Sequence, residues 1–309
     1  MKRIIQTLFY LTTLISLLFS IPVTHSSELY FIDAHSQVDE GIELEELLQR
    51  MHGAGINKSI LSSRRRRSAF DVADWAESHP SKIIPSIRVK GKHYSKDTPK
   101  FYKKIKKRVN SQRFRAMSEV LLYHAQKGEY AAEVIVYPDD KRVKTVLDAT
   151  MEKGWPLVLH IEFAAIYGEM RKEFYRQMET LIAANPEHPF CMMHMGQLKP
   201  NEVAELINKH KNLYFLTAHA TPMARHRSRQ PWVNMFQGKE LKPEWKSLMI
   251  KHPDRFIFAL DNVWAEHWRN DYKEQADIWR HALQKLPVDV AHAVAHGNAE
   301  RLWKLTDRK

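Results

Sequence analysis

The sequence predicts an α/β barrel of the TIM type, a single domain over residues 28–309. Three observations support this fold. Strand-like apolar segments alternate with helix-like segments along the chain, as expected for a parallel sheet with helical crossovers. The 309 residues are sufficient for a barrel of roughly 250 residues. The turn after the first segment, Asp33 to Gln37, contains no glycine for phosphate approach, which disfavours an open doubly wound sheet.

Eight apolar segments have the length and composition of strands. Each is followed by a stretch that can form a helix, and eight such pairs are the number that a TIM barrel requires. The predicted strands are residues 29–35, 58–61, 83–89, 133–137, 156–162, 190–196, 212–218 and 256–261.

Helical periodicity and capping residues define several of the helices. Leu44, Leu47, Leu48 and Met51 form an i, i+3, i+4, i+7 stripe. A second helix is predicted from about residue 68. Thr98-Pro99 is an N-cap followed by an N1 proline, and it predicts a long helical region that runs to about residue 128.

Acidic and histidine side chains lie at the ends of four of the predicted strands. They are Asp33, His35, His160, His194 and Asp261. The C-terminal ends of parallel barrel strands meet at one mouth, so these side chains are expected to converge there. Because side chains alternate along a strand, Asp33, His35 and Gln37 should share one face. Imidazoles and carboxylates are typical ligands of a divalent metal, so we expect a metal-assisted enzyme.

The first 26 residues resemble a secretory signal peptide. A short basic start at Lys2 and Arg3 precedes an apolar stretch over residues 4–23, and small residues at Thr24 and Ser26 suit a cleavage site. The chain is therefore expected to be exported, to the periplasm or the medium. The stretch is close to membrane-spanning length, so an uncleaved anchor is the alternative.

Composition and missing motifs exclude several other classes of protein. The single cysteine, Cys191, has no partner for an intrachain disulfide and is expected to be a buried thiol. We find no Gly-x-Ser-x-Gly, no Gly-x-x-x-x-Gly-Lys, no Cys-x-x-Cys and no His-Glu-x-x-His. A serine esterase, a P-loop ATPase, a zinc finger and a zincin protease all lose support.

Several motifs, taken in order, resemble the amidohydrolase superfamily, in its amidohydrolase-related (amidohydrolase 2) branch. The segment Phe31-Ile32-Asp33-Ala34-His35-Ser36-Gln37 resembles the opening Asp-x-His-x-His. The other matches are His160 for the strand-five histidine, His194-Met195-Gly196 for the strand-six His-x-Gly, Asp261 for the strand-eight aspartate, and His296-Gly297-Asn298-Ala299-Glu300-Arg301-Leu302 for the closing Gly-Asn-Ala-x-x-Leu.

This resemblance implies a TIM-barrel enzyme that uses one divalent metal ion. Zinc is expected, with manganese or iron as alternatives. By position, His35 and His160 would be metal ligands, Asp261 a ligand or proton acceptor, and His194 a ligand or the general acid/base. Hydrolysis of a C–N or C–O bond by metal-activated water is the expected reaction. Non-oxidative decarboxylation is the nearest rival.

Gln37 departs from the motif, because it replaces the second histidine. An amide oxygen is a harder and weaker donor than an imidazole, so as a ligand Gln37 would suit zinc less well. This departure keeps open a degenerate, non-catalytic barrel that binds a ligand or an envelope component. The predicted fourth strand carries no lysine that could bridge two metals, which favours a mononuclear site.

Other strand-end residues could face the substrate: Arg88, Glu162 and His219. Arg88 could pair with a substrate carboxylate or form a structural ion pair. The net charge of +12 includes the run from Arg64 to Arg67 and many lysines over residues 100–115. A small anionic substrate is therefore expected. Nucleic acid is not an expected partner of an exported protein, although the basic helix could contact anionic membrane or envelope polymers. The oligomeric state is left open.

Overall fold

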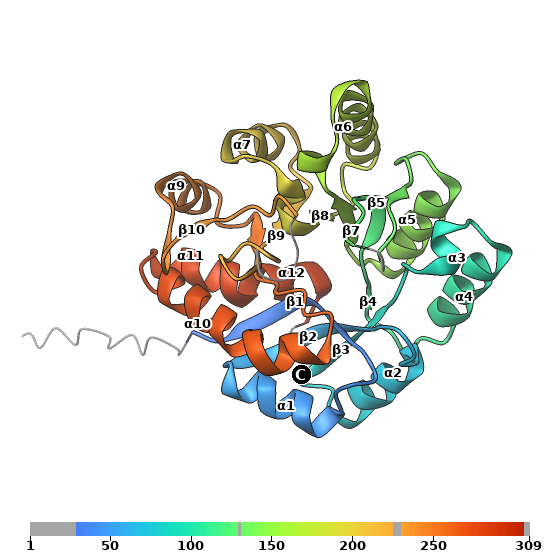
Figure 1. Ribbon diagram of the computed structural model, residues 1–309, viewed down its shortest axis with the longest axis horizontal. Helices are drawn as coiled ribbons and strands as arrows, with labels where there is room; N and C mark the ends of the chain where they lie inside the picture. Colours follow the sequence, from blue (N-terminus) through green and yellow to red (C-terminus); the bar gives the residue numbers. More distant parts are fainter. Residues whose placement is uncertain (1–28, 129–130, 225–229, 306–309) are drawn as a thin grey trace, which may run out of the picture.

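The computed structural model describes residues 29–128, 131–224 and 230–305, and it shows a TIM-barrel-like α/β fold. Helices surround a central ring of strands (Figure 1). The predicted signal peptide, residues 1–26, lies outside the described residues. Within the part of the chain that the structure describes, no helix is long and apolar enough to cross a membrane.

The strands form two sheets whose barrel strands run parallel. The first sheet has the order β1-β2-β3-β4 and the second β12-β9-β8-β7-β5-β6. Their bounds are β1 Phe31–Val38, β2 Ile56–Ser63, β3 Ile83–Ile87, β4 Ala116–Met117, β5 Val120–His124, β6 Val134–Ile135, β7 Leu157–Ile161, β8 Phe190–Met192, β9 Leu213–Leu216 and β12 Phe256–Ile257. A small hairpin, β10 Phe236–Gln237 and β11 Glu240–Leu241, lies outside them.

Two connections join the sheets into a barrel. β4 and β5 are successive parts of one extended segment, residues 116–124, which pairs with β3 on one side and with β7 on the other. At the opposite seam, the backbone amide of Ala34 in β1 donates to the carbonyl of Phe258, and the amide of Asp261 donates to the carbonyl of His35. Residues 116–124 therefore occupy the fourth barrel position and β12 the eighth.

The prediction for the fourth strand was wrong. Residues 133–137 do not form a barrel strand; β6 at Val134–Ile135 is a short antiparallel addition to β5. The helix predicted to reach residue 128 ends at Asn110. Thr98-Pro99 predicted where this helix begins, but no glycine or proline marks its end before Gly128. The apolar segment at residues 120–123 is nevertheless buried in strand β5, which pairs in parallel with β7.

Helices follow the strands around the outside of the barrel. Local capping defines several of their ends: Asp140 accepts a hydrogen bond from the amide of Arg142, and Gly154 ends the same helix at φ +66°. The bounds are α1 Leu44–Gly53, α2 Ala69–Ser78, α3 Lys92–Ser95, α4 Pro99–Asn110, α5 Lys141–Lys153, α6 Gly168–Ala183, α7 Pro200–Lys209, α9 Pro243–Lys251, α10 Tyr272–Leu283, α11 Val288–His292 and α12 Asn298–Trp303.

The core has two parts. A small apolar cluster takes residues from the strands around the ring, among them Ile32, Ile60, Val158 and Ile257, together with Trp303 of α12. Cys191 belongs to this cluster and is fully buried, as predicted. A larger cluster packs residues of the strands against the helices outside them. The interior is therefore a packed core, and polar groups concentrate towards the C-terminal ends of the strands.

Asp33 does not join the other polar side chains of β1. Its carboxylate accepts hydrogen bonds from the Ser36 hydroxyl (2.5 Å) and the Leu260 amide (3.0 Å). The hydroxyl of Tyr272 in α10 lies 3.4 Å away. The register of β1 against β2 is irregular between Asp33 and Ser36, so simple alternation fails there. Asp33 stabilises the seam between the first and eighth strands.

The buried imidazole of His188 makes the stability of this fold dependent on pH. Burial lowers the pKa of His188 to about 4, and the ring lies 3.3 Å from the Thr150 hydroxyl of α5. In the unfolded chain the ring takes up a proton near pH 6.5, so acidification from pH 7 to pH 5 favours unfolding. We expect wild-type protein to lose about 1–2 kcal/mol of unfolding free energy relative to His188→Gln over that range.

Urea unfolding of both proteins at pH 7 and pH 5 measures this difference. The exposed His52→Gln is the matched control for loss of an imidazole. Equal pH dependence in wild type and His188→Gln would contradict the assignment.

Candidate metal centre

Six acidic and histidine side chains converge at the C-terminal mouth of the barrel. Each comes from a different strand position, and none has more than 8% of its surface exposed. They are His35 of β1, Glu119 between β4 and β5, His160 of β7, and the residues that follow β8, β9 and β12: His194, His219 and Asp261. The predicted convergence of strand-end residues is therefore present, with Glu119 and His219 added to the predicted donors.

The Asp261 carboxylate lies among three imidazoles. The Nε2 atoms of His194, His35 and His219 are 3.6, 3.7 and 3.8 Å from its oxygens. Burial and the charge of Glu119 raise the pKa of Asp261. The imidazoles of His219 and His35 and the Lys90 ammonium outweigh them and hold this pKa below its usual range. Asp261 is therefore an ionised, buried carboxylate.

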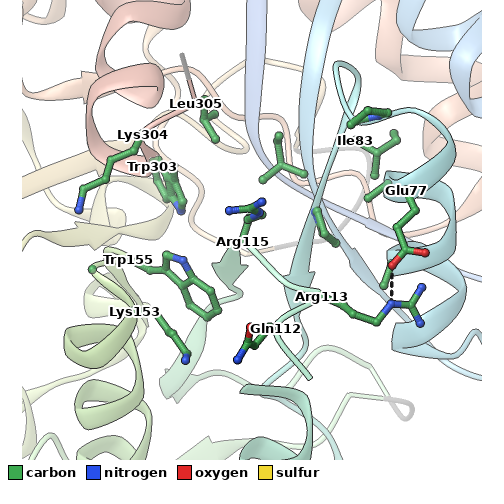
Figure 2. Close-up of a pocket in the computed structure, with 16 residues that line it drawn as sticks. Glu77, Ile83, Gln112, Arg113, Arg115, Lys153, Trp155, Trp303, Lys304 and Leu305 are labelled. Carbon is green, nitrogen blue, oxygen red and sulfur yellow. Dashed lines mark hydrogen bonds and ion pairs between the residues drawn. The ribbon is translucent and has the colours of Figure 1, made fainter. Parts of the chain in front are cut away.

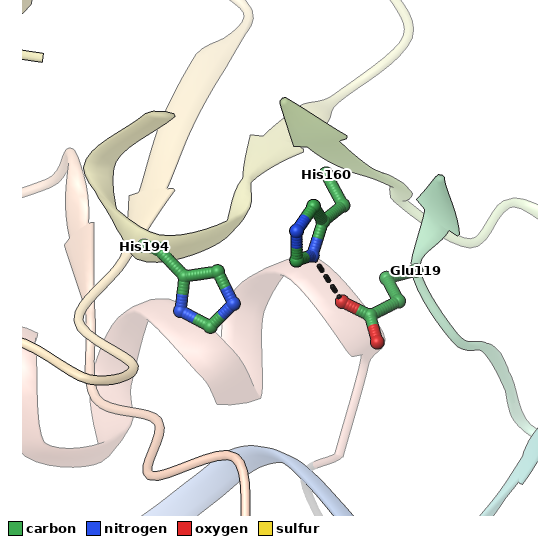
Figure 3. Close-up of side chains that lie close together, drawn as sticks. All are labelled: Glu119, His160 and His194. Carbon is green, nitrogen blue, oxygen red and sulfur yellow. Dashed lines mark hydrogen bonds and ion pairs between the residues drawn. The ribbon is translucent and has the colours of Figure 1, made fainter. Parts of the chain in front are cut away.

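Glu119 is the second buried carboxylate of the site. One oxygen is paired with the Lys90 ammonium and lies 3.8 Å from His35 Nε2. The other accepts a hydrogen bond of 2.8 Å from His160 Nδ1, and the His194 ring lies on the far side of His160 (Figure 3). Burial raises the pKa of Glu119, but the charges of Lys90 and His160 lower it well below its usual value.

His160 is held between two carboxylates. Its Nδ1 contacts Glu119, and its Nε2 lies 3.1 Å from Glu162. Burial lowers the pKa of His160, yet the two carboxylates outweigh burial and raise it above the usual value. The Lys127 ammonium donates to the same Glu162 oxygen at 2.5 Å. The His160 side of the site is thus a network of alternating charges.

The imidazole of His194, unlike that of His160, is neutral. Its Nδ1 donates to the carbonyl of Ala218 (3.1 Å), which fixes the tautomer and turns the Nε2 lone pair towards Asp261. Burial and the charge of His160 lower the pKa of His194 to about 4. The His194 ring stacks on the His219 ring with 4.6 Å between the ring centroids. The Trp232 ring packs against both imidazoles.

Three of the strand-end residues adopt a strained backbone. His194, His219 and Asp261 have φ values of +53°, +57° and +50°, the left-handed region that residues other than glycine rarely occupy. Each costs about 1 kcal/mol or more. Such conformations persist where the surroundings enforce them, and here they occur where the side chains converge.

The donor atoms fit a divalent cation. Among the described residues, His35 Nε2 and His194 Nε2 are buried and have no hydrogen-bond partner. The carboxylate oxygens nearest to them, 3.6 to 3.8 Å away, are beyond hydrogen-bond range. Four ligand atoms held tetrahedrally at about 2.1 Å from zinc lie roughly 3.4 Å apart. The donors fall into groups of three whose ligand atoms lie within 4.8 Å of one another, and two of these groups share Asp261: one with His35 and Glu119, the other with His194 and His219. Either group would accommodate zinc, manganese or iron.

The structure gives the other predicted site residues different surroundings. The Gln37 amide nitrogen donates to Asp261 (2.8 Å), and its oxygen accepts from Arg64 (3.2 Å). The reverse orientation would place oxygen against carboxylate, so here Gln37 positions Asp261. The Glu162 carboxylate accepts hydrogen bonds from His160, Lys127 and the Ala125 amide. Arg88 lies in a neighbouring cleft.

Sequence reasoning missed Glu119, Lys90 and Lys127. Glu119 and the residues that follow it were assigned to a helix, although the apolar run 120–123 ending at His124 follows the same rule that identified the other strands. Lys90 comes three residues after β3, and Lys127 three residues after β5. No local pattern distinguishes these two lysines from the many others in the chain.

A cavity lies at the opposite end of the barrel from the metal donors. It measures about 560 Å³ and is bordered by the starts of strands, including Ile83 and Arg115, and by Trp155 and Trp303. Figure 2 shows the Arg113–Glu77 ion pair at its edge. Its described lining contains no histidine, so the metal donors and this cavity are separate.

A comparison with protein-family sequence models identifies the family. The amidohydrolase model matches residues 22–305. The chain belongs to the amidohydrolase family. A search of curated protein sequences finds no relative that matches significantly.

Solved structures share the fold of this family member at low sequence identity. An uncharacterised TIM-barrel protein from Bordetella bronchiseptica has 17% identity and a TM-score of 0.59, covering 86% of this chain and 84% of that one. A 2,6-dihydroxybenzoate decarboxylase has 15% identity and a TM-score of 0.56, covering 90% and 99%. A 2-pyrone-4,6-dicarboxylic acid hydrolase from Pseudomonas putida, whose assignment is provisional, has 11% and 0.57, covering 91% and 100%.

The convergence on Asp261 predicts how metal binding responds to its loss. After equilibration with zinc, manganese or iron, wild-type protein should retain about one ion per chain. Asp261→Asn keeps the shape of the side chain but removes the charge that His35, His194 and His219 share, so affinity should fall about tenfold or more. Elemental analysis after dialysis measures this loss.

The exposed Glu205→Gln serves as the charge-matched control and should bind like wild type. Retention of the ion by Asp261→Asn would show that the donors of this site do not hold it.

Proposed function

We propose that this protein is a metal-dependent hydrolase that cleaves a C–N or C–O bond of a small anionic substrate. The observation that carries the proposal is the meeting of two buried, ionised carboxylates, Glu119 and Asp261, with the unpartnered Nε2 atoms of His35 and His194. A divalent ion would be held by donors from this set. When bound, such an ion lowers the pKa of water from 15.7 to about 7 and so supplies a nucleophile at neutral pH.

The side chains around these donors are suited to moving a proton. Asp261 is ionised and can accept a proton, while its position is held by the Gln37 amide. His194 is neutral at pH 7, because its pKa is about 4, and its Nε2 faces the same carboxylate. The one of these two residues that does not ligate the ion is our candidate for proton transfer to the leaving group.

Aromatic and cationic side chains form the surroundings of the reacting groups. Trp232 packs on the rings of His194 and His219. The Lys127 ammonium lies over the Trp232 ring, 4.6 Å from the ring centre. Lys90 adds a second buried cation at Glu119. Packed rings exclude water, while the Lys127 and Lys90 ammonium groups are neutralised by Glu162 and Glu119.

Decarboxylation of a small acid is the second candidate function. The chain matches nearly the full length of a 2,6-dihydroxybenzoate decarboxylase in fold, and the same donors would serve either reaction. The Lys90–Glu119 pair supports a third outcome, because an ammonium group already offsets one of the two carboxylates. A barrel that binds ligands without turnover would have this property.

A substrate panel separates the three. Metal-loaded protein should be incubated with amides, lactones and esters of small mono- and dicarboxylic acids, and with aromatic and unsaturated acids, while acid products and carbon dioxide are followed. We expect ring or amide hydrolysis without carbon dioxide. The activity should fall by at least two orders of magnitude in Asp261→Asn, since loss of a positioned proton acceptor has this effect, and Glu205→Gln should remain active.

Release of carbon dioxide would contradict the hydrolase and support the decarboxylase. Absence of any product with zinc, manganese and iron would favour the non-catalytic barrel.

A further inference from the structure

A cationic cleft adjoins the candidate metal centre. It has a volume of about 380 Å³ and lies between the loop after β2, the segment after β3 and helix α4. The segment after β3 contributes Arg88, Lys90 and Lys92, and α4 contributes Lys104 and Arg108. Two further arginines come from the loop after β2, and the described lining contains no aspartate or glutamate.

Most of this positive charge has no carboxylate partner. Among the described residues, none of Arg88, Lys92 and Lys104 forms an ion pair, and the Nε of Arg88 is buried without a hydrogen-bond partner. Arg108 donates to the backbone carbonyl of Arg88 at 2.8 Å, which orders the guanidinium without neutralising it. Lys90 is paired with Glu119 on the metal side.

Like charges in the cleft repel one another. Burial and the charges of Arg64 and Arg108 lower the pKa of Arg88 to about 10. Burial, followed by the charges of Arg108, Lys100 and Arg88, lowers the pKa of Lys104. Clustered cations raise the energy of the empty cleft, and an anion with more than one charge relieves that repulsion. Ser68, the N-cap of α2, and Ala69, its first residue, also line the cleft, so the positive end of a helix dipole lies beside it.

The loop after β2 borders the cleft through Arg65 and Arg67. Arg64 turns inward to Gln37 and lies 4.0 Å over the ring of Trp264. Arg67 is fixed by the backbone carbonyls of Asp39 and Ile42. Two of the four arginines, Arg64 and Arg67, are therefore committed to internal contacts, and the cleft has the size of a small molecule rather than of a polymer.

We propose that this cleft binds the charged end of the substrate, a group with two negative charges such as a phosphate monoester or a pair of carboxylates. Lys90 is the link between the two sites, because it lines the cleft and contacts Glu119 of the metal centre. A substrate anchored in the cleft would thus have its reactive part beside Asp261 and Glu119. This inference rests on the proposed function, in that the bound anion is taken to be part of a substrate.

Two double variants with equal loss of charge test the proposal. Lys92→Gln/Lys104→Gln removes two exposed lysines that line the cleft, and Lys103→Gln/Lys106→Gln removes two exposed lysines of α4 that do not. Calorimetric titration at low ionic strength with inorganic phosphate, malonate and acetate should show binding of the first two by wild type. Affinity should fall at least tenfold in the cleft variant and less than twofold in the control.

An equal loss in both variants, or binding of acetate as tight as that of malonate, would overturn the proposal. The single variants Lys104→Gln and Lys103→Gln decide the question if a double variant does not fold. Phosphate without malonate, or the reverse, identifies which dianion the cleft selects.

The same titration in Asp261→Asn distinguishes this inference from the proposed function. Binding should persist there, since the cleft lysines are intact when the ion is lost. Wild-type protein that binds dianions but shows no turnover would support the cleft and contradict the hydrolase. Wild-type protein that turns over substrate but binds no dianion would do the reverse.

Discussion

Burial of the Glu119 carboxylate is the constraint around which the mouth of the barrel is arranged. Its two oxygens take the Lys90 ammonium and the His160 imidazole, and His35 approaches at 3.8 Å. A buried carboxylate is tolerated only with such partners, and removal of one partner of a buried charge pair costs about 3–5 kcal/mol. The break between β4 and β5 places Glu119 at this point, so the irregular fourth strand and the charge network depend on each other.

The same region stores backbone strain. His194, His219 and Asp261 each adopt the left-handed conformation shortly after their strands end, and the imidazoles that follow β8 and β9 lie 3.6–3.8 Å from the Asp261 carboxylate. A regular continuation of these strands would carry the side chains apart. The packed interior below, with Trp303 and the small strand residues, supplies the stability that holds these conformations.

Much of this arrangement follows from the sequence, because barrel topology brings strand ends together wherever they lie in the chain. His35, His160, His194 and Asp261 could be named on that ground alone. Glu119 was missed because its segment was taken as part of the basic helix before it, although the apolar run at residues 120–123 is itself a strand signal. The orientation of Gln37 could not be predicted, because its amide is fixed by Arg64 and Asp261 from distant segments. Side-chain roles set by such long-range partners leave no local pattern.

The central claim is that the strand-end donors form one metal centre. Diffraction data collected on either side of the zinc absorption edge, from crystals equilibrated with zinc, test it directly. We expect one strong anomalous peak beside Asp261, with either His35 and Glu119 or His194 and His219 as its other neighbours, and its disappearance in Asp261→Asn crystals. A peak confined to the surface, or none at the barrel mouth, would contradict the account.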